Sequence, residues 1–111
     1  ALERFRAAVK AARLAPPTLT VYSNVTGRPY PASVPEMESL LAQQLVSPVE
    51  WHSSLAHLCR ASGARPSAVF ECGPKRELKA VMRRFDREMW ERTVSLDVGE
   101  KKDPGTSLDV G

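Results

Sequence analysis

Two histidines and two cysteines are the side chains in this sequence best suited to metal binding or nucleophilic chemistry. His52 and His57 lie five residues apart, about 140° around a helix, so they cannot hold one metal ion from a single helix face. Cys59 and Cys72 have no metal-ligand spacing and stand in apolar surroundings, which favours buried structural thiols over reactive ones. The sequence has no Gly-x-Ser-x-Gly turn, P-loop, Gly-x-Gly-x-x-Gly or His-Glu-x-x-His motif. We therefore expect no metal site and no self-contained catalytic centre in these residues.

Basic side chains are the second group with chemical potential. Residues 1–94 carry 14 Lys and Arg against 9 Asp and Glu, whereas residues 95–111 carry 2 against 4. The densest basic group comes late in the chain and consists of Lys75, Arg76, Lys79 and Arg83. Such a surface favours acidic partners, although a solvated helix face has the same composition. Nucleic acid is disfavoured, because the aromatic residues stand in core-type contexts and match no RNA-binding motif.

The first half of the chain is expected to position these residues with two helices and a strand. Apolar residues from Leu2 to Ala12 recur at helical spacing, and Pro16-Pro17 ends that helix. The segment TLTVYSNV, residues 18–25, is rich in β-branched and aromatic residues and predicts a strand that closes at Thr26-Gly27. A further helix is expected to start near Pro35 and to carry Met37, Leu40, Leu41 and Leu45 on one face.

The second half adds two helices and one strand. Ser47-Pro48-Val49-Glu50 resembles a capping box and predicts a helix to about Ala61 that buries Trp51, Leu55 and Leu58. Residues 66–72 predict a short strand, and apolar periodicity predicts a helix from Lys75 to about Trp90. From residue 95 polar residues, glycine and proline dominate, and the pentapeptide SLDVG occurs twice, which indicates a flexible tail over 95–111.

The predicted order is helix, strand, helix, helix, strand, helix, which is typical of an α/β layer with a largely parallel sheet. The 111 residues allow one domain at most. Two strands are too few for a stable sheet, so the segment 1–94 is expected to be incomplete as an independent domain. No apolar run is long enough for membrane insertion. The basic, amphipathic first residues are compatible with a mitochondrial presequence and equally with an internal helix.

Several motifs in order resemble one enzyme family. YSNVTGR (residues 22–28), LAQQLVSPVEW (41–51), FECGPKRELKAVMRR (70–84) and the late Trp90 together resemble malonyl-CoA:acyl carrier protein transacylases, most of all the animal mitochondrial form. The resemblance covers about residues 1–98. It implies that residues 1–94 are the C-terminal part of the hydrolase-like core of the acyltransferase fold. In that family the nucleophilic serine and the catalytic histidine precede the corresponding segment, so neither His52 nor His57 is expected to have that role.

The resemblance also implies roles for residues that the chain does contain. Gln44 matches a family glutamine whose backbone carbonyl orients the catalytic histidine, here a histidine outside this chain; taken alone, it reads as an exposed residue at a helix end. Asn24 matches a family asparagine near the active-site cleft, a candidate for substrate binding. Lys75, with Arg76, stands where a glycine followed by a basic residue is more usual.

The function implied is transfer of malonyl from coenzyme A to the phosphopantetheine thiol of acyl carrier protein in fatty acid synthesis, with no cofactor consumed. The partners are then malonyl-CoA and acyl carrier protein, and the basic group around Lys79 is expected to dock the acidic carrier. Two alternatives stay open: a non-catalytic fragment or truncated isoform that at most binds a partner, and an acyltransferase domain of a polyketide or fatty acid synthase. The 111-residue chain alone is expected to be inactive. The resemblance implies the mitochondrial matrix, with the cytoplasm as the alternative.

Overall fold

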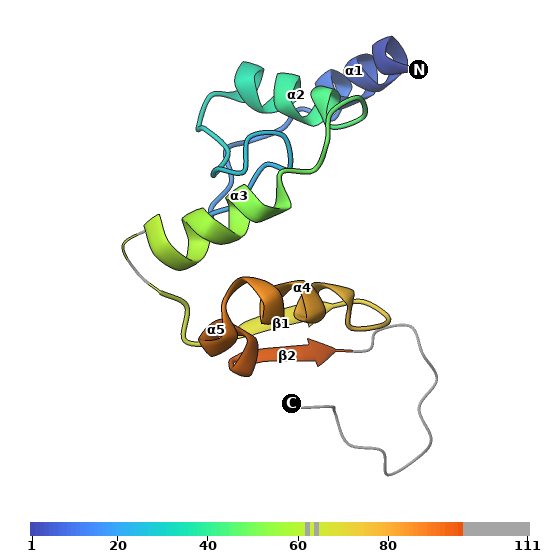
Figure 1. The fold of residues 1–111 in the computed structure, drawn as a ribbon. Helices are drawn as coiled ribbons and strands as arrows, with labels where there is room; N and C mark the ends of the chain where they lie inside the picture. The colour runs from blue at the N-terminus through green and yellow to red at the C-terminus, as the bar shows by residue number, and fades with distance from the viewer. Residues whose placement is uncertain (62, 64, 97–111) are drawn as a thin grey trace, which may run out of the picture. The chain divides into compact units, whose positions relative to one another are not determined.

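The computed structural model of the chain describes residues 1–61, 63 and 65–96, which fall into two compact units. The first unit, Ala1–Gly63, is helical, and the second contains a small parallel sheet with two helices. Figure 1 shows the order of these elements. The combination of helices with a parallel sheet confirms the α/β class predicted from the sequence. In the described part of the chain, every helix is too short or too polar to cross a membrane.

Two helices, α1 (Leu2–Ala11) and α2 (Val34–Gln43), pack against each other in the first unit. Val9 of α1 is buried, as are Met37 and Ala42 of α2. The sequence explains where α2 begins, because the Ser33 hydroxyl accepts a hydrogen bond from the Glu36 backbone N–H and a proline occupies the first turn. Both helices were predicted, and both are confirmed. The predicted place of Leu45 on the apolar face of the second helix is wrong, because α2 ends at Gln43 and Leu45 is 55% exposed.

The strand predicted over residues 18–25 is wrong. This segment forms a single antiparallel bridge between Tyr22 and Pro29, bordered by hydrogen bonds from Ser23 N to Arg28 O (2.8 Å) and from Tyr30 N to Val21 O (2.8 Å). The ladder stops there because prolines at 29 and 31 have no backbone N–H to donate. The β-branched residues therefore build a looped ribbon instead of a sheet strand.

The helix predicted to begin within residues 47–50 begins later than predicted, at Trp51. α3 (Trp51–Ala56) continues into a π-helical turn, η1 (His57–Ala61), which confirms a helix to about residue 61 with Leu55 buried. Trp51 and Leu58, which were also predicted to be buried, are half-buried. The predicted capping box is wrong: Glu50 precedes α3 with φ −81° and ψ 60°, and no side chain caps the helix. The Glu50 N–H instead donates to the Asn24 carbonyl over 2.7 Å, so the docked loop helps set where the helix begins.

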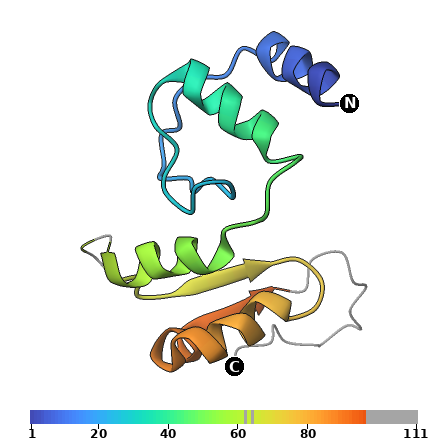
Figure 2. The ribbon, with the colours of Figure 1, turned by 45° about the horizontal axis from the view of Figure 1, so that its top comes forward.

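The second unit is a strand–helix–helix–strand arrangement. β1 (Val69–Cys72) pairs in parallel with β2 (Thr93–Leu96), and α4 (Glu77–Phe85) and α5 (Arg87–Glu91) form the crossover between them. Both helices lie along the same side of the strand pair (Figures 1 and 2). β1 confirms the strand predicted at 66–72. β2 was missed, and the predicted boundary at residue 94 lies inside it; residues 97–111 of the predicted tail lie outside the described residues.

Glu71 joins the sheet to α4 from a buried position on β1. One carboxylate oxygen accepts the Leu78 N–H (2.7 Å), and the other accepts the Lys79 N–H (3.2 Å) and the Ser95 hydroxyl (3.1 Å). The first backbone N–H groups of a helix have no partner within it and form its positive end, so a carboxylate there is stabilising. Glu71 thus fixes the start of α4, which no side chain of its own caps.

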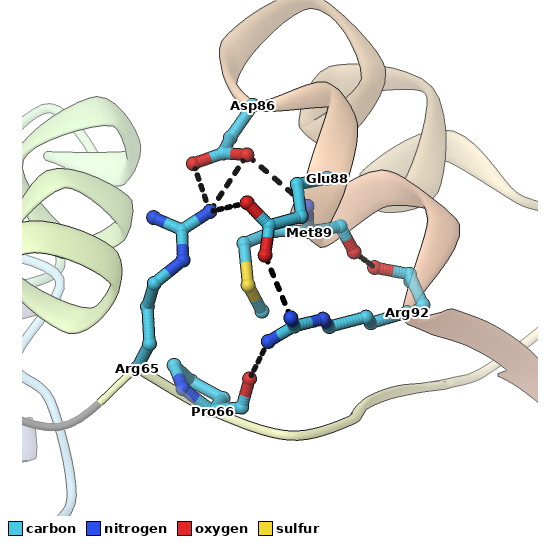
Figure 3. Close-up of polar contacts among 7 residues, drawn as sticks. Arg65, Pro66, Asp86, Glu88, Met89 and Arg92 are labelled. Atoms are coloured by element: carbon cyan, nitrogen blue, oxygen red, sulfur yellow. Dashed lines mark hydrogen bonds and ion pairs between the residues drawn. The ribbon is translucent and has the colours of Figure 1, made fainter.

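The helix predicted from Lys75 to Trp90 is divided at Asp86. This residue is extended (φ −155°, ψ 106°), and its carboxylate accepts the Met89 N–H (3.1 Å), which starts α5. Figure 3 shows the ion pairs around it: Arg65 lies 2.9 Å from Asp86 and 3.4 Å from Glu88, and Arg92 lies 2.6 Å from Glu88. The single helix predicted here is therefore wrong, because Asp86 ends α4 and caps α5.

Candidate functional site

The predicted site residues Asn24 and Gln44 belong to the first unit, and the basic residues belong to the second. Asn24 lies in a tight turn that is stabilised by hydrogen bonds to Ser23, and Ser23 is fully buried. The Ser23 hydroxyl accepts the Val25 N–H (3.1 Å), and its carbonyl accepts the Gly27 N–H (2.9 Å). Asn24 is half-buried in this turn, and not at the end of a sheet strand, where the strand predicted over residues 18–25 would have placed it.

Gly27 lets this turn approach the start of α3. It has φ +66°, and a Cβ atom added there would lie 2.4 Å from the Ser53 Cβ and 3.2 Å from the Glu50 carbonyl oxygen. The neighbouring Arg28 side chain donates to the Gly27 carbonyl over 2.9 Å. A residue with a side chain would have to push the turn and the helix apart. The YSNVTGR motif is therefore a loop shaped to dock on α3.

Gln44 is exposed and follows the last residue of α2. Its N–H donates to the Leu40 carbonyl over 3.1 Å, and the next two N–H groups, of Leu45 and Val46, donate to Ala42 and Gln43. Among the described residues, no backbone N–H is placed on the Gln44 carbonyl itself. A free carbonyl at the negative end of a helix can accept a hydrogen bond from an imidazole N–H. Free carbonyls are common at helix ends, so the histidine-orienting role stays a prediction.

The basic residues of α4 line a groove of about 580 Å³ in the second unit. Its walls are formed by Arg76, Lys79, Ala80, Arg83, Arg84 and Trp90. Three of the four predicted docking residues are thus brought together. Lys75 is not among the lining residues; it is exposed and has a left-handed backbone with φ +70°.

Trp90 organises the cations of this groove. The ring centre lies 5.1 Å from the Arg83 guanidinium carbon and 5.9 Å from both the Lys79 ammonium nitrogen and the Arg87 guanidinium carbon. These distances are typical of cation–π contacts, which involve arginine and tryptophan most often. Lys79 is only 7% exposed, whereas Arg83 is exposed. The structure therefore separates one buried ammonium from the solvent-facing guanidinium groups.

The role of Trp90 was not predicted from the sequence, although one signal was present. Lys79, Arg83 and Arg87 are spaced by four residues, which places such side chains in one row along a helix. The break at Asp86 returns the chain so that Trp90 lies beneath that row. Spacing alone could indicate the row of cations, whereas the aromatic ring under it depends on the tertiary structure.

The histidines and cysteines differ in surroundings. His52 is exposed, and the His57 Nδ1 lies 2.6 Å from the Tyr22 hydroxyl, which ties α3–η1 to the ribbon. Cys59 is buried, as predicted, but Cys72 is exposed, so its predicted burial is wrong. The reason is that Cys72 lies on the side of β1 away from the buried Glu71. Within the described ranges, no three His, Cys, Asp or Glu side chains are grouped as metal ligands.

Comparison with curated proteins finds relatives that cover most of the chain. It is 35% identical over 99 residues to the human mitochondrial malonyl-CoA-acyl carrier protein transacylase, which is 88% of this chain and 25% of that protein. It is 38% identical over 87 residues to a probable mitochondrial transacylase of the same name from Drosophila melanogaster, which is 78% of this chain and 23% of that protein.

The mouse mitochondrial malonyl-CoA-acyl carrier protein transacylase is 31% identical over 83 residues, which is 74% of this chain and 22% of that protein. The chain therefore spans about a quarter of the length of the curated relatives that it matches. No protein-family model matches the chain. The similarity to three proteins of one name confirms the resemblance predicted from the motifs.

Proposed function

We propose that this chain is a segment of a malonyl-CoA:acyl carrier protein transacylase, which moves malonyl from coenzyme A to the phosphopantetheine thiol of acyl carrier protein in fatty acid synthesis. The observation that carries the proposal is 31–38% identity to three proteins of that name over most of the chain. All three names contain the word mitochondrial, which supports a location in mitochondria, and we propose the matrix. None of them names a multifunctional synthase, which disfavours the synthase-domain alternative.

Exposed apolar side chains support a place inside a larger hydrolase-like core. They are Leu19, Val21, Leu45, Val46 and Val49 in the first unit and Phe70, Leu78 and Val81 in the second. Phe70 is 61% exposed on a parallel strand, and parallel sheets in proteins are usually covered on both faces. Further polypeptide packed on these residues would complete the core. We therefore propose that the fold is the C-terminal part of the acyltransferase core.

In the proposed reaction, some of the catalytic groups belong to this chain and others to polypeptide outside it. A serine outside the chain attacks the malonyl thioester, a malonyl-serine ester forms as coenzyme A leaves, and the carrier thiol then takes the malonyl group. A histidine, also outside the chain, accepts and returns the proton. The Gln44 carbonyl accepts a hydrogen bond from that imidazole and so holds one tautomer and one orientation.

Two substitutions at Gln44 in the full-length protein test this main-chain role. Gln44→Ala keeps the carbonyl, so we expect kcat to stay within about twofold. Gln44→Pro removes the N–H that donates to Leu40 and displaces the helix end, so we expect kcat to fall by about 10²–10⁴ with little change in KM for malonyl-CoA. Equal losses in both variants would assign the role to the side chain, and two unaffected variants would refute it.

The basic residues are proposed to dock acyl carrier protein by long-range attraction that weakens as salt rises. Lys75 and Arg76 are exposed and offer the contact surface, whereas the buried Lys79 contributes only its charge. Reversing Lys75 and Arg76 to glutamate in the full-length enzyme should raise KM for the carrier, and this rise should become smaller as the salt concentration increases. Reversing the exposed Arg4 and Arg13 is the matched control. If both pairs act alike, the docking assignment is wrong.

A further inference from the structure

The groove beside Trp90 is cationic without acidic residues in its walls. Four of its six lining residues are lysine or arginine, and the other two are Ala80 and Trp90. The nearest buried carboxylate on the strands, that of Glu71, is occupied by two backbone N–H groups and the Ser95 hydroxyl. Glu88 is engaged by Arg65 and Arg92. The charge of the groove is therefore not balanced by its own walls.

The surroundings of Lys79 indicate a ligand independently of the residue composition of the groove walls. Its side chain is more than nine-tenths buried, yet the interactions of the ammonium group within the described residues are limited to the Trp90 ring at 5.9 Å. A buried ammonium without a carboxylate is costly, because neither water nor a counter-charge compensates it. The backbone holds it in place nonetheless, since its own N–H is bound by Glu71. An anion entering the groove would supply the missing partner.

We infer that this groove binds the phosphate groups of a phosphorylated small molecule. Arginine guanidinium groups fit phosphate oxygens in a bidentate manner, and a phosphate monoester carries up to two negative charges against the four cations. A volume of about 580 Å³ is larger than a phosphate ion needs and suits a ligand of nucleotide size. The evidence for the phosphate site is the groove itself. The identification of coenzyme A as the source of the phosphates rests on the proposed function.

Trp90 fluorescence is a direct probe once Trp51 is replaced by phenylalanine. In that background the 111-residue chain is titrated at constant ionic strength with coenzyme A, dephospho-coenzyme A, pantetheine and inorganic phosphate. We expect saturable binding that is tightest for coenzyme A, at least about threefold weaker for dephospho-coenzyme A and absent for pantetheine. Lys79→Met keeps the aliphatic stem and removes the charge, so it should weaken coenzyme A binding at least about tenfold. Arg83→Gln should act in the same direction.

The control removes one positive charge elsewhere. Arg4→Gln, at an exposed residue of the first unit, should change coenzyme A affinity by less than about twofold. Pantetheine binding as tightly as coenzyme A, or Lys79→Met and Arg83→Gln both binding like the parent, would overturn the phosphate site. Binding of inorganic phosphate with no preference for coenzyme A would support the site and overturn coenzyme A as its ligand. Malonyl transfer by the full-length protein is a separate readout, so failure of the proposed function would leave the binding of phosphate groups in the groove unchanged.

Discussion

Replacing Gly27 by alanine tests whether the loop carrying Asn24 is built around a residue without a side chain. The left-handed backbone at φ +66° costs an alanine about 1–2 kcal/mol. The new Cβ would lie 2.4 Å from the Ser53 Cβ, whereas carbon atoms in contact are about 3.5–4.0 Å apart. Relieving such overpacking costs about 1–3 kcal/mol. We therefore expect Gly27→Ala to lower the free energy of unfolding by about 2–5 kcal/mol.

Gly63 is the matched control for the cost of placing alanine in a left-handed backbone conformation. It also has a positive φ, +85°, but no atom lies within 4 Å of a Cβ added there. Gly63→Ala should therefore cost only about 1–2 kcal/mol. Urea unfolding followed by Trp51 fluorescence in a Trp90→Phe background reports on the first unit, which contains both glycines. Equal destabilisation by the two substitutions would refute the close packing of the loop on α3.

Four further substitutions test the second unit. Glu71→Gln should lower the free energy of unfolding by about 1–3 kcal/mol, measured by urea unfolding with Trp90 fluorescence, because an amide has only one oxygen for three donors; no loss would contradict the capping role. Lys75→Gly should raise the melting temperature, because it removes a left-handed penalty of about 1 kcal/mol at φ +70°; a lower melting temperature would contradict this. Asp86→Ala should cost about 1 kcal/mol through its lost cap, more than Arg65→Ala at about 0–1 kcal/mol, and urea unfolding that shows the reverse order would argue against the cap.

Elements with local signals were predictable from the sequence. α2 begins where a serine cap and a proline in the first turn coincide, and β1 is a short apolar run before Gly73-Pro74. The looped ribbon at residues 18–25 was not predictable in this way. Its side chains suit a sheet strand, but the prolines across the ribbon have no N–H to donate to a ladder. β2 was missed because its pairing with β1 is formed by residues 24 positions apart, a distance beyond any local pattern.

The candidate site was predictable only in part. The basic residues of α4 were identified by type, and helical spacing placed Lys79 and Arg83 in one row. Their division into a buried ammonium and exposed guanidinium groups depends on Trp90, which reaches them only because α5 follows the break at Asp86. Gln44 was identified by resemblance, since nothing in its local sequence distinguishes it from other residues at helix ends.

The decisive assay is malonyl transfer from malonyl-CoA to holo acyl carrier protein, made on the full-length polypeptide that contains this chain and, in parallel, on the 111-residue chain alone. We expect transfer by the full-length protein through a malonyl-serine ester that mass spectrometry detects, and no transfer by the chain alone. A full-length protein that forms no such ester and transfers no malonyl, or a chain of 111 residues that transfers it unaided, would refute the assignment of this chain to a transacylase.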